Sequence, residues 1–156
     1  MEAGLLSQKL DGHRECVNCV AYSAAGGLLA SCSDDGAAKV WGVGSSQVAF
    51  GPEGHAAEVS CVAFSLDGAL VATGARDSLI KMWDARWGLL VRTLQGHLKA
   101  VQCIAFSPDG ALVASGSVDR SCRVWSVSGA LRRSAEFAAN VRALAFALSC
   151  LFVSCN

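Results

Sequence analysis

Hydrophobic residues along this chain occur in short runs of four to six, separated about every ten residues by Gly, Asp, Ser or Pro. Runs of this length, rich in β-branched residues and bounded by turn formers, predict β-strands rather than helices. Within Val17–Tyr22 both alternating sets of side chains are largely apolar. This pattern predicts a strand covered on both faces. We therefore expect an all-β protein without helices.

The pattern recurs with a period of 42 residues. Three Gly-His pairs and three Trp residues share this spacing, and each His is followed by Ser or Thr, Asp and Trp at fixed intervals of 18, 4 and 6 residues. The three sets are His13, Ser31, Asp35 and Trp41; His55, Thr73, Asp77 and Trp83; and His97, Ser115, Asp119 and Trp125. A fixed period of this length indicates one repeated supersecondary unit.

Other segments keep the same register. The apolar strings are Val17–Tyr22, Val59–Phe64 and Val101–Phe106, and each leads into a turn with Gly at the same place. We expect segments 5–10, 46–50, 89–94 and 131–136 each to form the outer strand of the preceding unit. The three strands after each segment would complete the next unit.

This chain resembles the WD-repeat family of β-propellers, whose unit carries Gly-His near its start and Trp-Asp near its end. The full Trp83-Asp84 pair occurs in the second repeat, whereas Trp41 and Trp125 are followed by Gly42 and Ser126. The resemblance implies a partial propeller of about three and a half four-stranded antiparallel blades. It spans residues 1–156, with repeats at about 5–45, 46–87 and 88–129 and a partial repeat at 130–156.

In the family, the His, Ser or Thr, Asp and Trp side chains form a buried chain of hydrogen bonds. A catalytic triad would use some of the same residue types, but nucleophilic catalysis needs one such group in a cleft rather than three copies. The resemblance therefore implies structural tetrads. Because the tetrads use every His of the chain, none is left as a general base or a metal ligand. We expect no enzyme activity.

The fourth repeat departs from the pattern. It begins at Val141–Phe146 with Phe137 in place of His, loses the Gly turn, and ends before any Asp or Trp. Closed propellers usually have four to eight blades. Three explanations remain open: a fragment or truncated form of a longer protein, a homodimer whose two halves sum to seven repeats, or a stable open arc.

Composition narrows the choice of partners. The chain has 156 residues, 53% of them hydrophobic, and a formal net charge of zero, which fits one domain with a full core. The scattered Lys and Arg residues favour neither nucleic acid nor an anionic membrane as partner. The start lacks the features of a signal peptide, and no apolar run is long enough to span a bilayer. We expect a soluble cytoplasmic protein.

The eight Cys residues raise the question of a disulfide or zinc framework. Cys19, Cys61 and Cys103 occupy equivalent positions one repeat apart, so they cannot converge on one metal. Cys16 and Cys19 form a Cys-x-x-Cys motif, but no second pair completes a tetrahedral site. We expect reduced structural thiols, with no metal and no cofactor.

The remaining candidates are surface residues for binding proteins or peptides. In the family, the upper end is formed by the loops after each Gly-His and the tight turns before each Asp. Those loops differ between the repeats while the frame stays constant, as in a binding platform. The candidates at this end are Arg14, Glu15, Asp34, Glu58, Arg76, Lys99 and Val118.

The opposite end offers a second candidate surface. Trp83-Asp84-Ala85-Arg86 resembles the Trp-Asp-x-Arg box of substrate receptors that dock on the adaptor of cullin-type ubiquitin ligases, and Trp87 follows it. Arg next to Trp is typical of a binding hot spot. We expect a non-catalytic protein-interaction scaffold, with a ubiquitin-ligase substrate receptor as the alternative.

Overall fold

The computed structural model describes residues 9–24, 26–43, 48–50, 54–147 and 150–155. Within these ranges it contains fourteen strands and no helix. The strands are β1 (Val17–Tyr22), β2 (Leu28–Ser33), β3 (Ala38–Gly42), β4 (Val48–Phe50), β5 (Val59–Phe64), β6 (Leu70–Ala75), β7 (Ile80–Asp84), β8 (Leu90–Leu94), β9 (Val101–Phe106), β10 (Leu112–Ser117), β11 (Ser121–Ser126), β12 (Leu131–Glu136), β13 (Val141–Ala147) and β14 (Cys150–Cys155).

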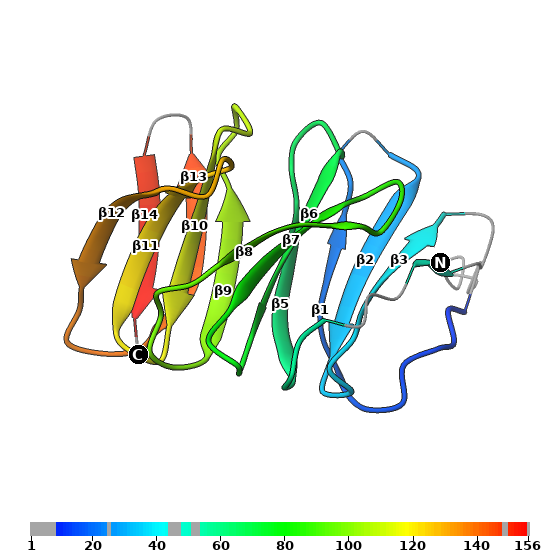
Figure 1. Ribbon diagram of the computed structural model, residues 1–156, viewed down its shortest axis with the longest axis horizontal. Coiled ribbons are helices and arrows are strands. Elements are labelled where there is room, and N and C mark those ends of the chain that lie inside the picture. Colours follow the sequence, from blue (N-terminus) through cyan, green and yellow to red (C-terminus); the bar gives the residue numbers. More distant parts are fainter. Residues whose placement is uncertain (1–8, 25, 44–47, 51–53, 148–149, 156) are drawn as a thin grey trace, which may run out of the picture.

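The strands form three four-stranded sheets and one two-stranded sheet, each antiparallel and ordered as in the sequence. The sheets stand side by side as blades of an open arc (Figure 1), and the inner strands β1, β5, β9 and β13 contact one another in turn. The predicted all-β partial propeller of about three and a half blades is confirmed.

The hydrophobic core lies between neighbouring blades rather than inside a single sheet. Val59, Val101 and Val141 each begin the inner strand of a blade, and each is fully buried against the blade before it. Small residues such as Ala30, Ala72 and Ala114 have no exposed surface, which allows close approach of the sheets. The apolar strings of the sequence thus become the strands that join one blade to the next.

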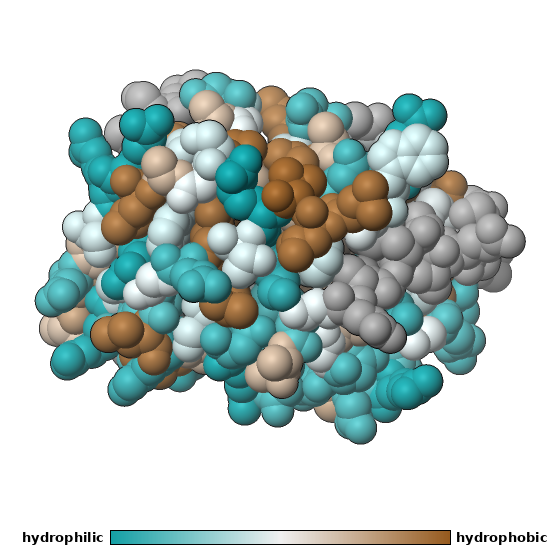
Figure 2. Space-filling model, in the orientation of Figure 1, coloured by the Kyte–Doolittle hydropathy of each residue, from teal (hydrophilic) through white to brown (hydrophobic). Residues whose placement is uncertain are grey.

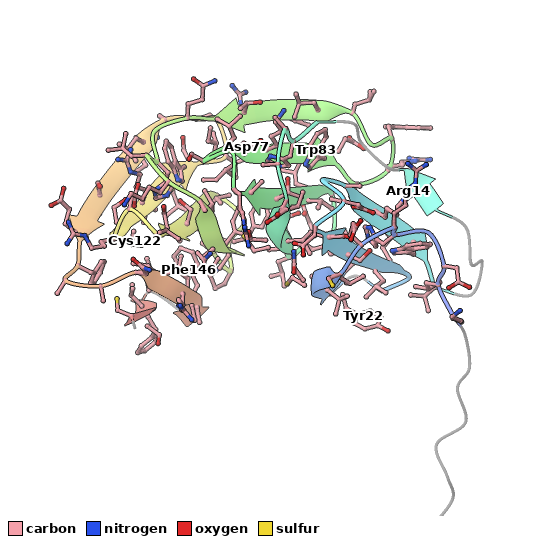
Figure 3. All side chains as sticks on the ribbon, turned by 90° about the horizontal axis from the view of Figure 1, so that it is seen from below. Arg14, Tyr22, Asp77, Trp83, Cys122 and Phe146 are labelled. Carbon is pink, nitrogen blue, oxygen red and sulfur yellow. The ribbon has the colours of Figure 1, made fainter. Side chains whose placement is uncertain are left out.

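The first inner strand departs from the prediction that it is covered on both faces. Val17, Val20 and Tyr22 are 52%, 57% and 71% exposed, whereas Val59 and Val62, in the equivalent strand of the second blade, are buried. In Figure 3, Tyr22 points away from the sheets. The physical reason is that none of the described residues packs on this face of β1. The alternate residues of β1 face the second blade, where Cys19 and Ala21 join the core.

The outer strands lie where the sequence places them. β4, β8 and β12 fall within the predicted segments 46–50, 89–94 and 131–136, and each pairs with the third strand of its sheet. The predicted strand at 5–10 lies mostly outside the described residues, and Lys9 and Leu10 are not in a strand. Because the strands alternate in direction, the Gly-His loops and the turns before β3, β7 and β11 share one end of the arc, the upper end. The turns after β1, β5 and β9, and those after β3, β7 and β11, lie at the lower end.

Candidate functional site

The structure brings the four side chains of each repeated set together. In the first blade, Nδ1 of His13 lies 2.9 Å from Oδ2 of Asp35, and Nε2 lies 2.7 Å from Oγ of Ser31. The indole N–H of Trp41 donates to the same Ser31 hydroxyl over 2.9 Å. The second set (His55, Thr73, Asp77, Trp83) and the third set (His97, Ser115, Asp119, Trp125) have the same three contacts at 2.8 to 2.9 Å.

The Asp of each tetrad fastens the upper loops to the blade. Oδ2 of Asp35 accepts the backbone N–H of Arg14 as well as the His13 ring, and Oδ1 accepts the N–H of Ala37. Asp77 and Asp119 bind the corresponding backbone groups of their own repeats. One carboxylate therefore holds the loop after the Gly-His pair and the tight turn in a fixed relation.

The imidazoles of the second and third tetrads favour the neutral form. Burial lowers the pKa of His55 and His97 below the usual value, and the bonds to Asp77 and Asp119 offset only part of this shift. A neutral ring with its proton on Nδ1 can donate to the carboxylate and accept the hydroxyl proton at Nε2. The chain of bonds then runs in one direction from the indole to the Asp.

The carboxyl groups of Asp35 and Asp119 favour the charged form, because the effect of burial on their pKa is outweighed by hydrogen bonds. Burial raises the pKa of Asp35, but the N–H of Arg14 and the His13 ring outweigh burial and lower this pKa to about 2. Burial also raises the pKa of Asp119, but the Ser121 hydroxyl and backbone donors outweigh burial and hold this pKa well below its usual range. Both carboxyl groups are therefore ionised at neutral pH.

The hydroxyls of the tetrads have no access to a substrate. Ser31, Thr73 and Ser115 are buried, and each hydroxyl is bonded on one side to an indole and on the other to an imidazole. A serine nucleophile instead needs an open face beside an oxyanion site. The geometry of these three sets is that of a structural bond network.

A cleft of about 330 Å³ opens at the upper end between the first and second blades. It brings together three of the residues that the sequence singled out: Asp34, Glu58 and Arg76. Nε of Arg76 lies 2.5 Å from Oε2 of Glu58. Asp34 accepts a 2.7 Å bond from the side chain of Asn18. The rest of the lining is Asp35, Gly36, His55, Ala56 and Ala57.

The other upper-end candidates lie outside this cleft. Arg14, Glu15 and Lys99 are exposed, and Val118 is half-buried. The backbone of Arg14 is held by Asp35, but its side chain stays at the surface, as Figure 3 shows. These residues are distributed over the first and third blades and do not form one site with Asp34 and Glu58.

At the lower end, the candidate residues of the second blade lie in one tight turn. Oδ1 of Asp84 accepts the backbone N–H groups of Arg86 and Trp87. The guanidinium of Arg86 stacks 5.0 Å above the Trp87 ring, which is 66% exposed. Exposed Leu89, Leu90 and Val91 continue the surface, and Figure 2 shows hydrophobic side chains gathered over β8. The turn thus presents a cation and an aromatic ring beside an apolar strand.

The sequence did not show that the upper cleft needs two adjacent blades. Gly36, Ala57 and the edge of His55 enter the site because the tight turn of the first blade meets the Gly-His loop of the second. The 42-residue period could have suggested this meeting, since neighbouring repeats must present these two loops side by side. The depth of the cleft depends on side-chain packing, which the sequence pattern does not determine.

Within the described residues, we find no group of three or more His, Cys, Asp or Glu side chains placed to hold a metal ion. The same residues include no helix of the length and hydrophobicity required to cross a membrane.

Stacked antiparallel blades with three equivalent hydrogen-bonded tetrads define a propeller-type repeat protein. Residues 4–42, 46–84 and 88–126 match the WD40 family, the WD domain with G-beta repeats. These segments make up most of the chain, so the protein belongs to the WD40-repeat family. The predicted resemblance is confirmed.

The similar proteins are matched over only part of their own length. A stretch of 35 residues is 54% identical to the WD40 repeat-containing protein HOS15 of Arabidopsis thaliana, covering 22% of this chain and 6% of that protein. The structure of U3-55K matches with 29% sequence identity and a TM-score of 0.87. The match covers 92% of this chain and 47% of the U3-55K chain. The crystal structure of the RRP9 WD40 repeats is 30% identical with a TM-score of 0.87, over 92% and 46%. The chain spans about half the length of these two structures.

Proposed function

We propose that the protein is a non-catalytic scaffold that binds a basic segment of a partner protein in the upper cleft. WD40 propellers generally bind other proteins, which supports a role for this chain as an interaction module. The observation that carries the proposal is the cleft itself, because loops from two blades combine there into a concave site of about 330 Å³.

The charge of the cleft supports a basic partner. Asp34, Asp35 and Glu58 contribute carboxylates, and Arg76 is paired with one of them. His55 adds no positive charge near neutral pH, because burial lowers its pKa. The excess of negative charge favours a Lys or Arg side chain, since complementary charge increases both the association rate and the specificity of a complex.

The test is to measure the binding of short peptides by fluorescence anisotropy, with matched sets that carry either Lys and Arg or Glu at the same positions. The basic set should bind, and the double variant Asp34→Lys/Glu58→Lys should bind about tenfold more weakly, which corresponds to about 1.4 kcal/mol. Lys99→Glu is the matched control, because it alters an exposed charge at the same end but outside the cleft. Preference for acidic peptides, or unchanged binding by the double variant, would refute the proposal.

The turn of the second blade supports a second candidate function, docking on the adaptor of a cullin-type ubiquitin ligase. The supporting observation is the exposed Arg86 guanidinium stacked on Trp87. The planar guanidinium carries five donors, so another side chain replaces it poorly. Arg86→Ala should abolish capture of the purified adaptor without unfolding the protein, whereas Arg14→Ala at the opposite end should leave capture unchanged. If wild type does not bind the adaptor, or if Arg86→Ala binds equally well, this candidate is dropped.

A further inference from the structure

One cross-strand position distinguishes the first blade from the next two. The Cys in the middle of each inner strand lies directly opposite a residue of the second strand: Cys19 opposite Cys32, Cys61 opposite Gly74, and Cys103 opposite Gly116. Positions 32, 74 and 116 are one repeat apart. The first blade therefore carries two thiols where the others carry one thiol and a glycine.

The glycines show why this difference matters. A Cβ added at Gly74 would lie 2.8 Å from Sγ of Cys61, and one added at Gly116 would lie 2.6 Å from Sγ of Cys103. The missing Cβ thus leaves room both for the thiol of the inner strand and for the valine that begins the next inner strand, Val101 or Val141, which lies nearer still. In the first blade Cys32 stands at this position, directly opposite Cys19. Sγ of Cys19 also donates to the backbone oxygens of Val20 and Val62 over 3.8 and 3.9 Å.

The two thiols differ in access to solvent. Cys32 is fully buried, while Cys19 is partly exposed. The equivalent Cys61 and Cys103 are only 6% and 9% exposed. The contact with Cys32 also lowers the pKa of Cys19, and the same contact raises the pKa of Cys32. A partly exposed cysteine with a lowered pKa next to a second thiol is the usual arrangement of a redox-sensitive pair.

We propose that Cys19 and Cys32 form a reversible disulfide across the first blade when the protein meets a hydroperoxide. Residues directly opposite in an antiparallel pair have Cα atoms about 4.5 to 5.5 Å apart. A disulfide requires about 4.4 to 6.8 Å. The strands can therefore keep their register when the bond forms.

The reaction balances with hydrogen peroxide as the oxidant. The Cys19 thiolate attacks one peroxide oxygen, so that an S–O bond forms, the O–O bond breaks, and hydroxide leaves and takes up the thiol proton as water. Sulfur of Cys32 then attacks the sulfenic acid of Cys19. The S–S bond forms, the S–O bond breaks, and a second water leaves with the Cys32 proton. Both cysteines are oxidised and the peroxide is reduced to two waters.

The bond would lie close in sequence to residues of the upper cleft. Asn18, next to Cys19, donates to Oδ1 of Asp34 over 2.7 Å and to the backbone oxygen of Val59 over 3.0 Å. Asp34 itself follows Cys32 by two residues. A covalent link between β1 and β2 at this point would fix the turn that carries Asp34 and raise the melting temperature of the oxidised protein.

The experiment uses the full chain with Cys16→Ser, which removes the exposed neighbouring thiol. The protein is treated with hydrogen peroxide, its free thiols are alkylated under denaturing conditions, and its peptides are identified by mass spectrometry. We expect one cross-linked peptide joining Cys19 to Cys32, lighter by two hydrogen atoms and lost again on reduction with dithiothreitol.

The matched variant is Cys32→Gly, which restores the Cys–Gly pair of the second and third blades and should fold. In this variant Cys19 lacks the resolving thiol and also loses the contact that lowers its pKa. We therefore expect no cross-linked peptide and slower oxidation of Cys19 than in the reference protein, with any sulfenic acid that forms trapped by dimedone. The proposal is overturned if peroxide produces no link between Cys19 and Cys32 in the reference protein. It is equally overturned if Cys19 of the reference protein is oxidised no faster than Cys61, which lies opposite a glycine.

Discussion

At the scale of single residues, the three tetrads are alike but not identical. In the third blade, Oγ of Ser121 lies 3.1 Å from Nδ1 of His97 and donates to Oδ1 of Asp119 over 2.7 Å. The equivalent positions of the first two blades are Ala37 and Leu79, which have no hydroxyl. The period predicts the four shared members of each set, whereas this fifth member is specific to one repeat. Its role follows only from the structure.

The tetrads should contribute measurably to stability. His97→Ala should lower the free energy of unfolding by about 1 to 3 kcal/mol, because Ser115 and Asp119 lose a partner. Trp125→Ala should cost about 3 to 5 kcal/mol, since a large buried side chain is lost with the hydrogen bond. Urea denaturation measures both effects, and Leu98→Ala, at an 83% exposed position, is the control. Midpoints equal to that of wild type would contradict the structural role.

Stability should fall in acid in two stages. The folded-state pKa of His55 and His97 is lowered, so the unfolded chain binds more protons and stability is lost as pH falls through about 6.5. The lowered pKa of Asp35 and Asp119 adds a second loss, as pH falls from about 4 towards about 2. Calorimetry should show a falling melting temperature below neutral pH, and His97→Gln should weaken the first stage. A melting temperature that is constant from about pH 8 to about pH 5 would contradict this assignment.

At the scale of secondary structure, the tight turn of each blade places one residue in the left-handed region. The φ angles are +78° at Gly36, +68° at Ser78 and +69° at Arg120. Glycine adopts this conformation readily, whereas other residues pay a steric cost. The first blade thus has the favoured residue, and the second and third blades do not.

Exchanging these turn residues should change stability in opposite directions. Gly36→Ala should destabilise the protein by about 1 to 2 kcal/mol because it imposes the left-handed cost. Ser78→Gly should be neutral or stabilising by up to about 1 kcal/mol, since that cost is removed while the unfolded chain gains freedom. Thermal unfolding of both variants gives the comparison. Stabilisation by Gly36→Ala would mean that the turn has a different conformation.

Much of the fold could be predicted at this scale, because the order of the strands follows directly from the repeated spacing. The exposure of the outer face of β1 could not be predicted in this way. Val20 and Val62 occupy the same place in their strings, but Val20 is exposed and Val62 is buried. The Cys19–Cys32 pair was also missed, although Cys32 stands in register with Gly74 and Gly116. Differences between repeats, rather than the repeats themselves, carry the features specific to this protein.

The fourth blade also differs from the others, at the position of the tetrad. In the third blade the tetrad residue Ser115 pairs with Ile104 of the inner strand. At the equivalent place in the fourth blade, Val153 pairs with Leu144, so an apolar side chain replaces the tetrad hydroxyl. Phe137 packs in the same cluster as Val153, and both line a groove of about 640 Å³. In Figure 3, Cys122 and Phe146 mark the two sides of this junction. Apolar packing thus replaces the hydrogen-bonded chain in this blade.

At the scale of the whole molecule, the described residues form an arc with apolar side chains on both of its end blades. Val17, Val20 and Tyr22 are exposed on the first blade, and Phe152 is exposed on the fourth. Inside the arc, the equivalent faces are covered by a neighbouring blade. Exposed apolar faces of this kind promote association with another copy or another protein.

We therefore expect residues 1–156 to self-associate in solution. Light scattering coupled to size-exclusion chromatography should give dimers or larger species, because burying the outer face of β1 removes Val20 and Tyr22 from water. The double variant Val20→Lys/Tyr22→Lys should shift the population towards monomer, since burying two Lys side chains without partners is unfavourable. Leu98→Lys, on an exposed loop at the upper end, is the control and should leave the distribution unchanged. A sharp wild-type peak at 16.1 kDa with cooperative melting would instead establish the arc as a stable monomer.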